Sequence, residues 1–243
     1  MTGLINTIET LGGLDGPGIR TVFFLQGCPA RCTYCHNPEM LPVLRSAEGI
    51  TSEKQSHKTI YTPKQILDIA RKQAPYYGVL GGVTFSGGEP LAQSDFLLAT
   101  ILLLKKNKIH TVVDTSGIIF SPDVLKIADL TILDIKHTDA NKFQELVGLP
   151  IDNTLRTLEF LQKNNLPFWI RQVIIAGYNS DEDNILKLKS ISKGAQKIEL
   201  LPYHSMAKHK YEKLGLLYPK EIKDPSTELM ERLRGLFSDK QSI

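Results

Sequence analysis

The chain has 243 residues, of which 42% are hydrophobic and 23% are charged, and its 29 basic and 26 acidic side chains give a net charge of +3. These values are ordinary for a soluble globular domain with a full core, and the charge is too small to indicate nucleic acid or an anionic membrane as a partner. No stretch approaches the roughly 18 unbroken apolar residues of a membrane span. The N-terminal MTGLINTIETLGG has no basic segment followed by an apolar run, so we expect no signal peptide.

Short apolar runs alternate with segments of helical period along the chain. The runs predict strands at residues 19–27, 81–88, 109–117, 130–136, 167–177 and 196–203. Helices are predicted at residues 62–73, 94–107, 121–128, 152–165, 181–193 and 226–237, the first with Thr62 as N-cap and Pro63 at the first helical position. This order predicts a parallel α/β sheet, and six strands favour a partial, TIM-like (β/α)6 barrel over a closed eight-stranded one. A doubly wound open sheet also fits the pattern.

Two segments break the alternation. Residues 45–59 are polar and have no period, which predicts an exposed loop. Residues 204–226 are basic and contain Pro and Gly, and we expect the C-terminal part of the chain, about 204–243, to cover one mouth of the sheet. Because no repeat or linker divides the chain, we expect a single domain over residues 1–243.

All three cysteines lie in GCPARCTYCHNP, where Cys28, Cys32 and Cys35 have the spacing C-x3-C-x2-C. Such an odd cluster is typical of a metal or catalytic site in the reducing cytoplasm. A structural zinc ion needs a fourth ligand, and His36 directly follows a cysteine, so the two side chains rarely point at one ion. Three thiolates on an iron–sulfur cube leave one iron open to a substrate or cofactor. The plain alternatives are a zinc-stabilised binding module and three unrelated thiols.

Two motifs resemble the radical SAM superfamily. The cysteine spacing, with Tyr34 before the third cysteine, is similar to its signature, and SGGEP (86–90) at the end of the second predicted strand is similar to a second family element. The stretches DGPGIRTVFFLQG, HTVVDTSG, LDIKH, WIRQVIIAGYNSDEDN and IELLPYHSMAKHKYEKLG resemble, nearly end to end, the activators of glycyl radical enzymes. Many of those activators carry an inserted ferredoxin-like region with eight further cysteines. This chain lacks them, which favours the branch acting on pyruvate formate-lyase.

The resemblance implies a radical SAM oxidoreductase with a [4Fe–4S] cluster on the three cysteines and S-adenosylmethionine as second cofactor. Reductive cleavage of that cofactor would yield a radical that takes a Cα hydrogen from one glycine of pyruvate formate-lyase or a related glycyl radical enzyme. A reduced flavodoxin or ferredoxin would supply the electron. An activator of a different glycyl radical enzyme and a radical SAM enzyme acting on a small molecule remain as alternatives.

The resemblance also assigns site residues. Besides the cysteines, it implies catalytic roles for Lys136 and His204, and it allows a monovalent cation on Asp114, Thr115 and Asp134. Asp15 would meet the backbone of the partner's glycine-bearing loop. From the residues alone, an Asp–Lys ion pair, a turn held by Glu89 and a carboxylate partner for Arg171 are the structural readings. The full set expected at the cofactor is Tyr34, Cys35, His36, Gly87, Gly88, Glu89, Asp114, Asp134, Ile135, Lys136, Arg171 and His204.

Overall fold

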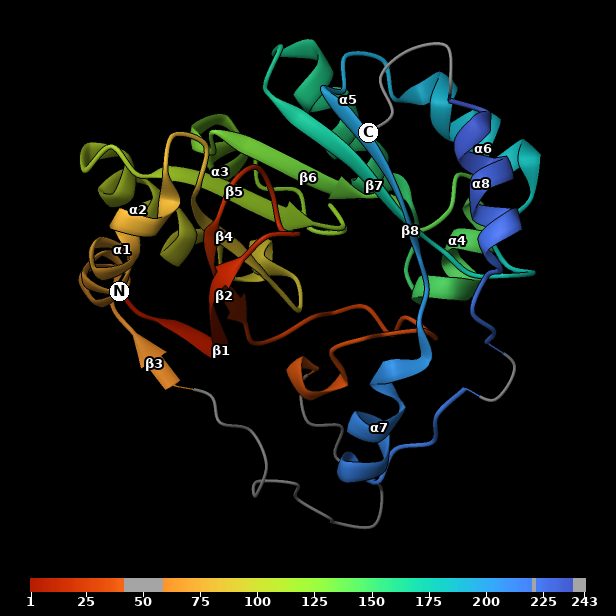
Figure 1. Cartoon of the computed structure of the whole chain (residues 1–243). Coiled ribbons are helices and arrows are strands. Elements are labelled where there is room, and N and C mark those ends of the chain that lie inside the picture. Colours follow the sequence, from red (N-terminus) through yellow and green to blue (C-terminus); the bar gives the residue numbers. More distant parts are fainter. Residues whose placement is uncertain (42–58, 220–221, 238–243) are drawn as a thin grey trace. The chain divides into compact units, whose positions relative to one another are not determined.

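The computed structural model describes residues 1–41, 59–219 and 222–237 (Figure 1). These residues form two compact units. The first comprises Met1–Pro29, Glu39–Thr115 and Ile119–Ile132, and the second Ala30–Pro38, Ser116–Ile118 and Leu133–Ile243. The predicted loop 45–59 lies outside the described residues except for its last residue. No helix of the described part of the chain is long and apolar enough to cross a membrane.

The first unit is built on a mostly parallel sheet with the strand order β3-β1-β2-β4-β5-β6. Strands β2 (Arg20–Leu25), β4 (Gly82–Gly87), β5 (His110–Thr115) and β6 (Leu130–Asp134) were all expected from sequence. The prediction missed β1 (Gly3–Gly12) and β3 (Thr59–Tyr61), which pair antiparallel at one edge. Most positions of β1 are exposed or half-buried and β3 has three residues, so neither forms the buried apolar run that identifies a central strand.

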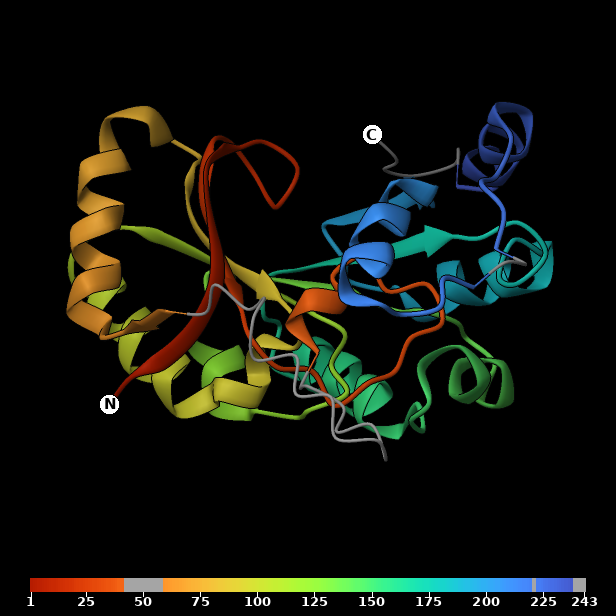
Figure 2. The same cartoon turned by 90° about the horizontal axis from the view of Figure 1, so that it is seen from below.

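Three helices, α1 (Pro63–Tyr77), α2 (Ser94–Lys106) and α3 (Pro122–Ile127), lie outside the strands of this unit (Figures 1 and 2). The predicted cap of α1 is confirmed, because Thr62 accepts from the Gln65 amide at 3.3 Å and the Gln65 side chain accepts from the Thr62 amide at 2.7 Å. The helices cover a core of fully buried side chains that includes Phe23, Leu25, Phe85, Leu97 and Ile101. Short 3-10 turns are η1 (Pro38–Met40) and η2 (Pro90–Gln93).

A buried arginine ties together the amino-terminal ends of three strands in this unit. Arg20 is fully buried, and its guanidinium donates to Thr84 Oγ1 at 2.7 Å and to the carbonyls of Pro17 and Val83 at 2.8 Å each. Its Nη2 also lies 3.2 Å from His110 Nδ1. Because Arg20 carries the charge, we assign His110 Nδ1 as the acceptor, so the imidazole is neutral in the folded chain.

This arrangement predicts a pH-dependent stability. Burial, followed by the charge of Arg20, lowers the pKa of His110 from its ordinary 6.5. The unfolded chain therefore binds a proton that the folded chain resists, so His110 contributes stability above pH 6.5 that is lost as the pH falls through the lowered pKa. In His110→Asn, which keeps an acceptor facing Arg20, the free energy of unfolding should fall less steeply below that pH. Urea unfolding at a series of pH values checks this, and equal slopes for both chains would contradict it.

The second unit has the strand order β6-β7-β8, with β7 (Phe168–Ile174) and β8 (Lys197–Pro202) parallel. Strand β8 has a single neighbour, and so does β3 in the first unit, so the strands form an open arrangement, as a partial barrel requires. The expected helices α5 (Asp152–Lys163), α6 (Glu182–Ile191) and α8 (Thr227–Gly235) are present.

The sequence prediction missed two short helices here, α4 (Ala140–Val147) and α7 (Lys208–Leu214), the latter preceded by the 3-10 turn η3 (Ser205–Ala207). Each has at most eight residues, so the helical period repeats too few times to be recognised. Glycines in the left-handed conformation, Gly148 at φ 76° and Gly215 at φ 65°, end the two helices. The segment 204–226, for which no helix was predicted, therefore contains α7.

Candidate active site

In the first unit, the glycine-rich end of β4 holds the segment that carries Cys28. The Gly88 amide donates to the Leu25 carbonyl at 2.9 Å, and the Glu89 amide donates to the Gly27 carbonyl at 2.8 Å. A Cβ on Gly88 would stand 2.2 Å from the Gly27 carbonyl oxygen, so only glycine allows this approach. These glycines therefore form a tight strand end, and the strand end positions the first cysteine.

Polar side chains at the carboxyl ends of β4 and β5 bond to one another. The buried Glu89 carboxylate accepts from Thr115 Oγ1 at 2.5 Å and from the Leu91 amide at 3.1 Å, so it holds the turn, as one sequence reading proposed. Asp114 accepts from Ser86 Oγ at 3.1 Å. These carboxylates thus lie at the strand ends where parallel α/β proteins place their sites.

Asp15 lies at the other end of the strands in this unit. Its carbonyl accepts from Thr84 Oγ1 at 2.7 Å, next to the start of β2, whereas Cys28 follows the end of β2. A strand of this length spans roughly 20 Å. The structure therefore does not bring Asp15 together with Cys28.

In the second unit, the segment Ala30–Pro38 carries the other two cysteines and is bonded to the end of α4. The Arg31 amide donates to the Val147 carbonyl and the Thr33 amide to the Leu146 carbonyl, both at 2.9 Å. Burial raises the pKa of Cys32 to about 11 although the charge of Lys136 opposes the shift. Cys32 is therefore a protonated thiol until a metal takes its thiolate.

Lys136 and Asp134 form an ion pair at the end of β6, with side chains that are 17% and 13% exposed. The expected structural pair is therefore present, but it is largely buried rather than solvated. Burial alone would lower the pKa of Lys136, yet the charge of Asp134, its hydrogen bond to Lys136 and the neighbouring Tyr34 and Cys32 together raise this pKa well above its ordinary value. The Lys136 ammonium also lies 5.6 Å from the centre of the Tyr34 ring, so a fixed positive charge faces the cysteine segment.

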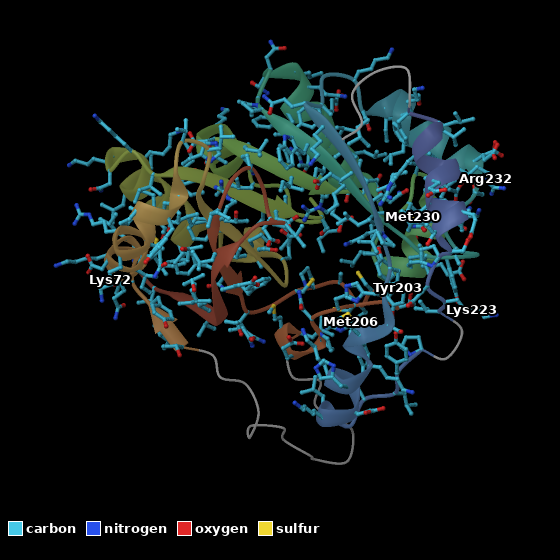
Figure 3. All side chains as sticks on the ribbon, in the orientation of Figure 1. Lys72, Tyr203, Met206, Lys223, Met230 and Arg232 are labelled. Atoms are coloured by element: carbon cyan, nitrogen blue, oxygen red, sulfur yellow. The ribbon has the colours of Figure 1, made fainter. Side chains whose placement is uncertain are left out.

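Aromatic rings stack beside the last cysteine. The His36 ring lies 4.4 Å from the His204 ring, at 22° between their planes, and 5.0 Å from the Tyr203 ring. Figure 3 shows Tyr203 where β8 ends and Met206 just beyond it. His204 thus contacts a predicted cofactor residue, although the two are far apart in sequence.

Three buried polar atoms of the second unit that belong to predicted cofactor residues test whether those residues fit a polar cofactor. Tyr34 OH, His36 Nε2 and Asp134 Oδ1 have no hydrogen-bond partner among the described residues. A buried polar atom without a partner is costly, so native proteins rarely leave several together unless a ligand satisfies them. A donor, an aromatic nitrogen and a carboxylate oxygen suit the adenine and amino groups of S-adenosylmethionine, so these residues fit that cofactor.

Arg171 on β7 has the carboxylate partner that its burial requires. Its Nε and Nη2 donate to Glu199 Oε2 at 3.0 Å and 2.9 Å, and Lys197 pairs with Glu199 Oε1 at 2.9 Å. The Arg171 carbonyl accepts from the Ile135 amide at 2.9 Å, which fixes the backbone just before Lys136. Arg171 therefore has a structural role beside any role toward the cofactor.

Sequence reasoning missed several residues around the cysteine segment. On α7, Lys210 donates to the His36 carbonyl and Tyr211 donates to the Cys35 carbonyl. No pattern in the sequence linked α7 to the cysteines.

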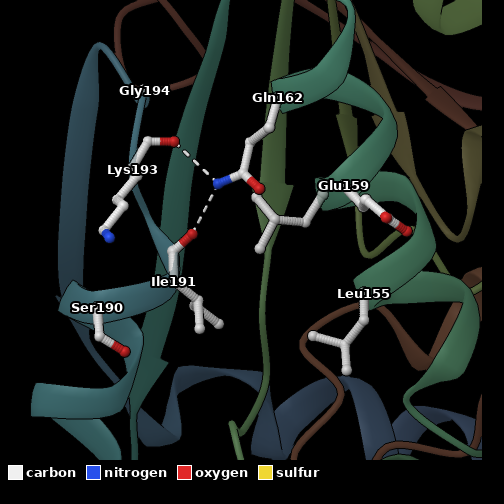
Figure 4. Close-up of a pocket in the computed structure, with 8 residues that line it drawn as sticks. Leu155, Glu159, Gln162, Ser190, Ile191, Lys193 and Gly194 are labelled. Carbon is white, nitrogen blue, oxygen red and sulfur yellow. Dashed lines mark hydrogen bonds between the residues drawn. The ribbon is translucent and has the colours of Figure 1, made fainter.

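A pocket of about 540 Å³ lies between α5 and the end of α6. Figure 4 shows the Gln162 side chain bridging its wall by donating to the carbonyls of Ile191 and Lys193, at 2.8 Å and 2.9 Å. None of its lining residues is a predicted site residue, so we do not assign the active site to this pocket. The lining residues are Leu155, Leu158, Glu159, Gln162, Ser190, Ile191, Lys193 and Gly194.

Comparison with known proteins agrees with the motifs. The model of the radical SAM superfamily matches residues 22–188. Pyruvate formate-lyase-activating enzyme of Streptococcus mutans is 34% identical, over 97% of this chain and 91% of its own. The enzyme of that name from Clostridium pasteurianum is 40% identical, over 89% and 88%.

Solved structures of radical SAM enzymes also resemble this chain. A domain of the pyruvate formate-lyase-activating enzyme from Bacteroides vulgatus matches with a TM-score of 0.55 at 26% identity, over 67% of this chain and 98% of its own. Streptococcus suis SuiB bound to its precursor peptide matches with a TM-score of 0.66 over 90% of this chain and 44% of its own, but at 15% identity it supports the fold alone. The zinc-module reading is therefore not favoured. The chain belongs to the radical SAM superfamily and, within it, to the family of pyruvate formate-lyase-activating enzymes.

Proposed function

We propose that this chain activates pyruvate formate-lyase (formate C-acetyltransferase) by generating a radical on one of its glycines. The observation that carries the proposal is the 34–40% identity, over 89–97% of the chain, to relatives named for that activity. The cysteine motif and SGGEP, at the ends of β2 and β4, support it because they are the two elements of the radical SAM signature. No observation favours another glycyl radical enzyme or a small molecule as the substrate.

Cys28, Cys32 and Cys35 hold a [4Fe–4S] cluster, and S-adenosylmethionine is the second cofactor. When bound, the two supply a carbon-centred radical, because one-electron reduction of the sulfonium cleaves a C–S bond and leaves methionine. That chemistry would remove one Cα hydrogen atom from the partner's glycine. The products are 5′-deoxyadenosine and a glycyl radical, so atoms and electrons balance with one electron from a reduced flavodoxin or ferredoxin.

The chain's own residues bind and orient these groups. Gly88 and Glu89 hold the segment that carries the first cysteine, and Gly87 pairs with Leu25 in the sheet just before it. Tyr34 and His36 offer their unpartnered atoms to the nucleoside, and Asp134 offers its free oxygen to the amino group. Lys136 and His204 face the cofactor, and Arg171 fixes the backbone at Ile135. A monovalent cation on Asp114, Thr115 and Asp134 completes the proposed cofactor site. Asp15, at the other end of the strands, is proposed only to contact the backbone of the partner's loop.

We also propose that the protein lies in the cytoplasm, because a cluster of this kind needs reducing surroundings. Reduced flavodoxin and ferredoxin are found in the same surroundings.

One experiment tests the function directly. The protein is purified without oxygen, loaded with iron and sulfide, and mixed with a reductant, S-adenosylmethionine and pyruvate formate-lyase from the same organism. We expect a glycine-centred radical by electron paramagnetic resonance that requires all four components. In the matched control, a lyase whose radical-bearing glycine is replaced by alanine should give no such signal. A cluster-loaded chain that forms the radical only on another glycyl radical enzyme would overturn the assigned partner.

A further inference from the structure

The cysteine segment Ala30–Pro38 is bonded on two sides within the second unit. In its first half, the backbone amides of Arg31 and Thr33 donate to carbonyls at the end of helix α4, as described above. Its second half presents carbonyl oxygens to α7, which follows more than 170 residues later in the chain: the separation between Cys35 and Tyr211 is 176. Figures 1 and 2 show α7 beside the orange stretch that contains this segment.

Two adjacent side chains of α7 make the second set of bonds. Tyr211, which is 7% exposed, donates its hydroxyl to the Cys35 carbonyl at 3.0 Å. Lys210 donates to the His36 carbonyl at 2.9 Å and to Asn37 Oδ1 at 3.0 Å. The three acceptors are consecutive residues and begin at the third cysteine, so α7 fixes both the position and the direction of the backbone there. The bonds from Lys210 are charge-assisted and stronger than ordinary ones.

An aromatic chain connects the same helix to the ring that stacks on His36. The Tyr211 ring packs edge-on against Tyr218, at 5.3 Å between centres and 87° between planes. The Tyr218 hydroxyl is hydrogen-bonded to that of Tyr203, which is 1% exposed and lies against His36. A movement of α7 would therefore disturb the backbone of Cys35 and the ring next to it together.

We infer that Lys210 and Tyr211 are positioning residues that hold the third cysteine and His36 in the geometry needed for the cluster. Neither side chain has to touch the cofactors, because each acts through the backbone carbonyls of the ligand segment. Residues that orient a metal ligand in this way commonly change metal affinity by roughly 10–100-fold when they are replaced. Lys210 also adds a fixed positive charge beside the cluster, which favours the reduced, more negative state. The inference rests on the proposed cluster and deepens the account of that site.

Four variants distinguish the effect of holding the cysteine segment in position from the effect of the Lys210 charge. Tyr211→Phe removes one hydroxyl and keeps the ring, Lys210→Met removes the charge and keeps the stem, and Lys210→Arg keeps the charge. Lys213→Met is the matched control, because Lys213 is an exposed lysine of the same helix that makes no side-chain hydrogen bond or ion pair to the described residues. The readouts are amide hydrogen exchange over residues 30–38, the half-time of iron loss to a chelator, and the midpoint potential of the cluster.

We expect Tyr211→Phe and Lys210→Met to exchange the amides of residues 30–38 faster than wild type and to lose iron about tenfold faster. Lys210→Met should also lower the midpoint potential, while Lys210→Arg and Lys213→Met should behave as wild type. If wild type holds a cluster and all variants match it in the three readouts, the positioning role is overturned while the proposed function stands. If wild type holds no cluster, the proposed function fails, and hydrogen exchange alone still decides whether α7 holds the segment.

Discussion

In a Cys32→Ala chain we expect iron to fall from about four atoms per molecule to nearly none, because a [4Fe–4S] cube needs every one of its few thiolates. Formation of 5′-deoxyadenosine and of the glycyl radical should fall to background with it. Cys32 is half-buried, and alanine is smaller and apolar, so the chain itself should still fold. Iron and sulfide analysis after oxygen-free reconstitution, with the absorption band of the cluster, measures this loss.

Thr33→Ala is the matched control for that prediction. Thr33 is exposed, and its hydrogen bond to the Leu146 carbonyl comes from the backbone amide, so a change of its side chain leaves the segment in place. This variant should bind iron as wild type does. Full iron content in Cys32→Ala, or bound zinc in place of iron in wild type, would contradict the cluster.

The second large effect is expected for Gly88→Ala at the end of β4. Its new Cβ would meet the Gly27 carbonyl oxygen at 2.2 Å and the carbonyl carbon at 2.7 Å, and because both are backbone atoms no side-chain rotation relieves the clash. We expect a loss of about 3 kcal/mol in the free energy of unfolding, the upper end for overpacking. Because Gly27 precedes Cys28, iron binding should weaken as well. Denaturant unfolding and iron titration measure the two effects.

Gly13→Ala controls for the change from glycine to alanine, since a Cβ at that position has no atom within 4 Å. Its free energy of unfolding should stay close to that of wild type. Unfolding curves and iron contents that coincide for Gly88→Ala and wild type would show that the strand end tolerates a side chain, and would remove the packing account of SGGEP.

The sequence predicted the central strands because each is a continuous buried apolar run, as in β4 and β6. It could not predict β1, whose residues are mostly exposed or half-buried, or α7, which ends at Gly215 after seven residues. Both elements owe their structure to tertiary contacts, β1 with β2 and β3 and α7 with the cysteine segment, and such contacts leave no local period.

In the candidate site, too, local patterns predicted some contacts, while contacts that depend on the tertiary structure could not be predicted. The order of parallel strands predicted that the ends of β4 and β5 lie together, and Glu89 does accept a bond from Thr115. Glu199 as the partner of Arg171 could be expected only as some carboxylate, because the register of β7 and β8 is not written in either strand alone. The bond between Tyr211 and Cys35 joins residues that no motif connects.

The most direct test of the central claim follows one hydrogen atom. Pyruvate formate-lyase produced with deuterium on the Cα of its glycines is incubated, without oxygen, with the cluster-loaded chain, a reductant and unlabelled S-adenosylmethionine. Our account predicts that the 5′-deoxyadenosine formed carries one deuterium atom and that a glycine-centred radical appears on the lyase. Unlabelled 5′-deoxyadenosine with no radical on the lyase would contradict it.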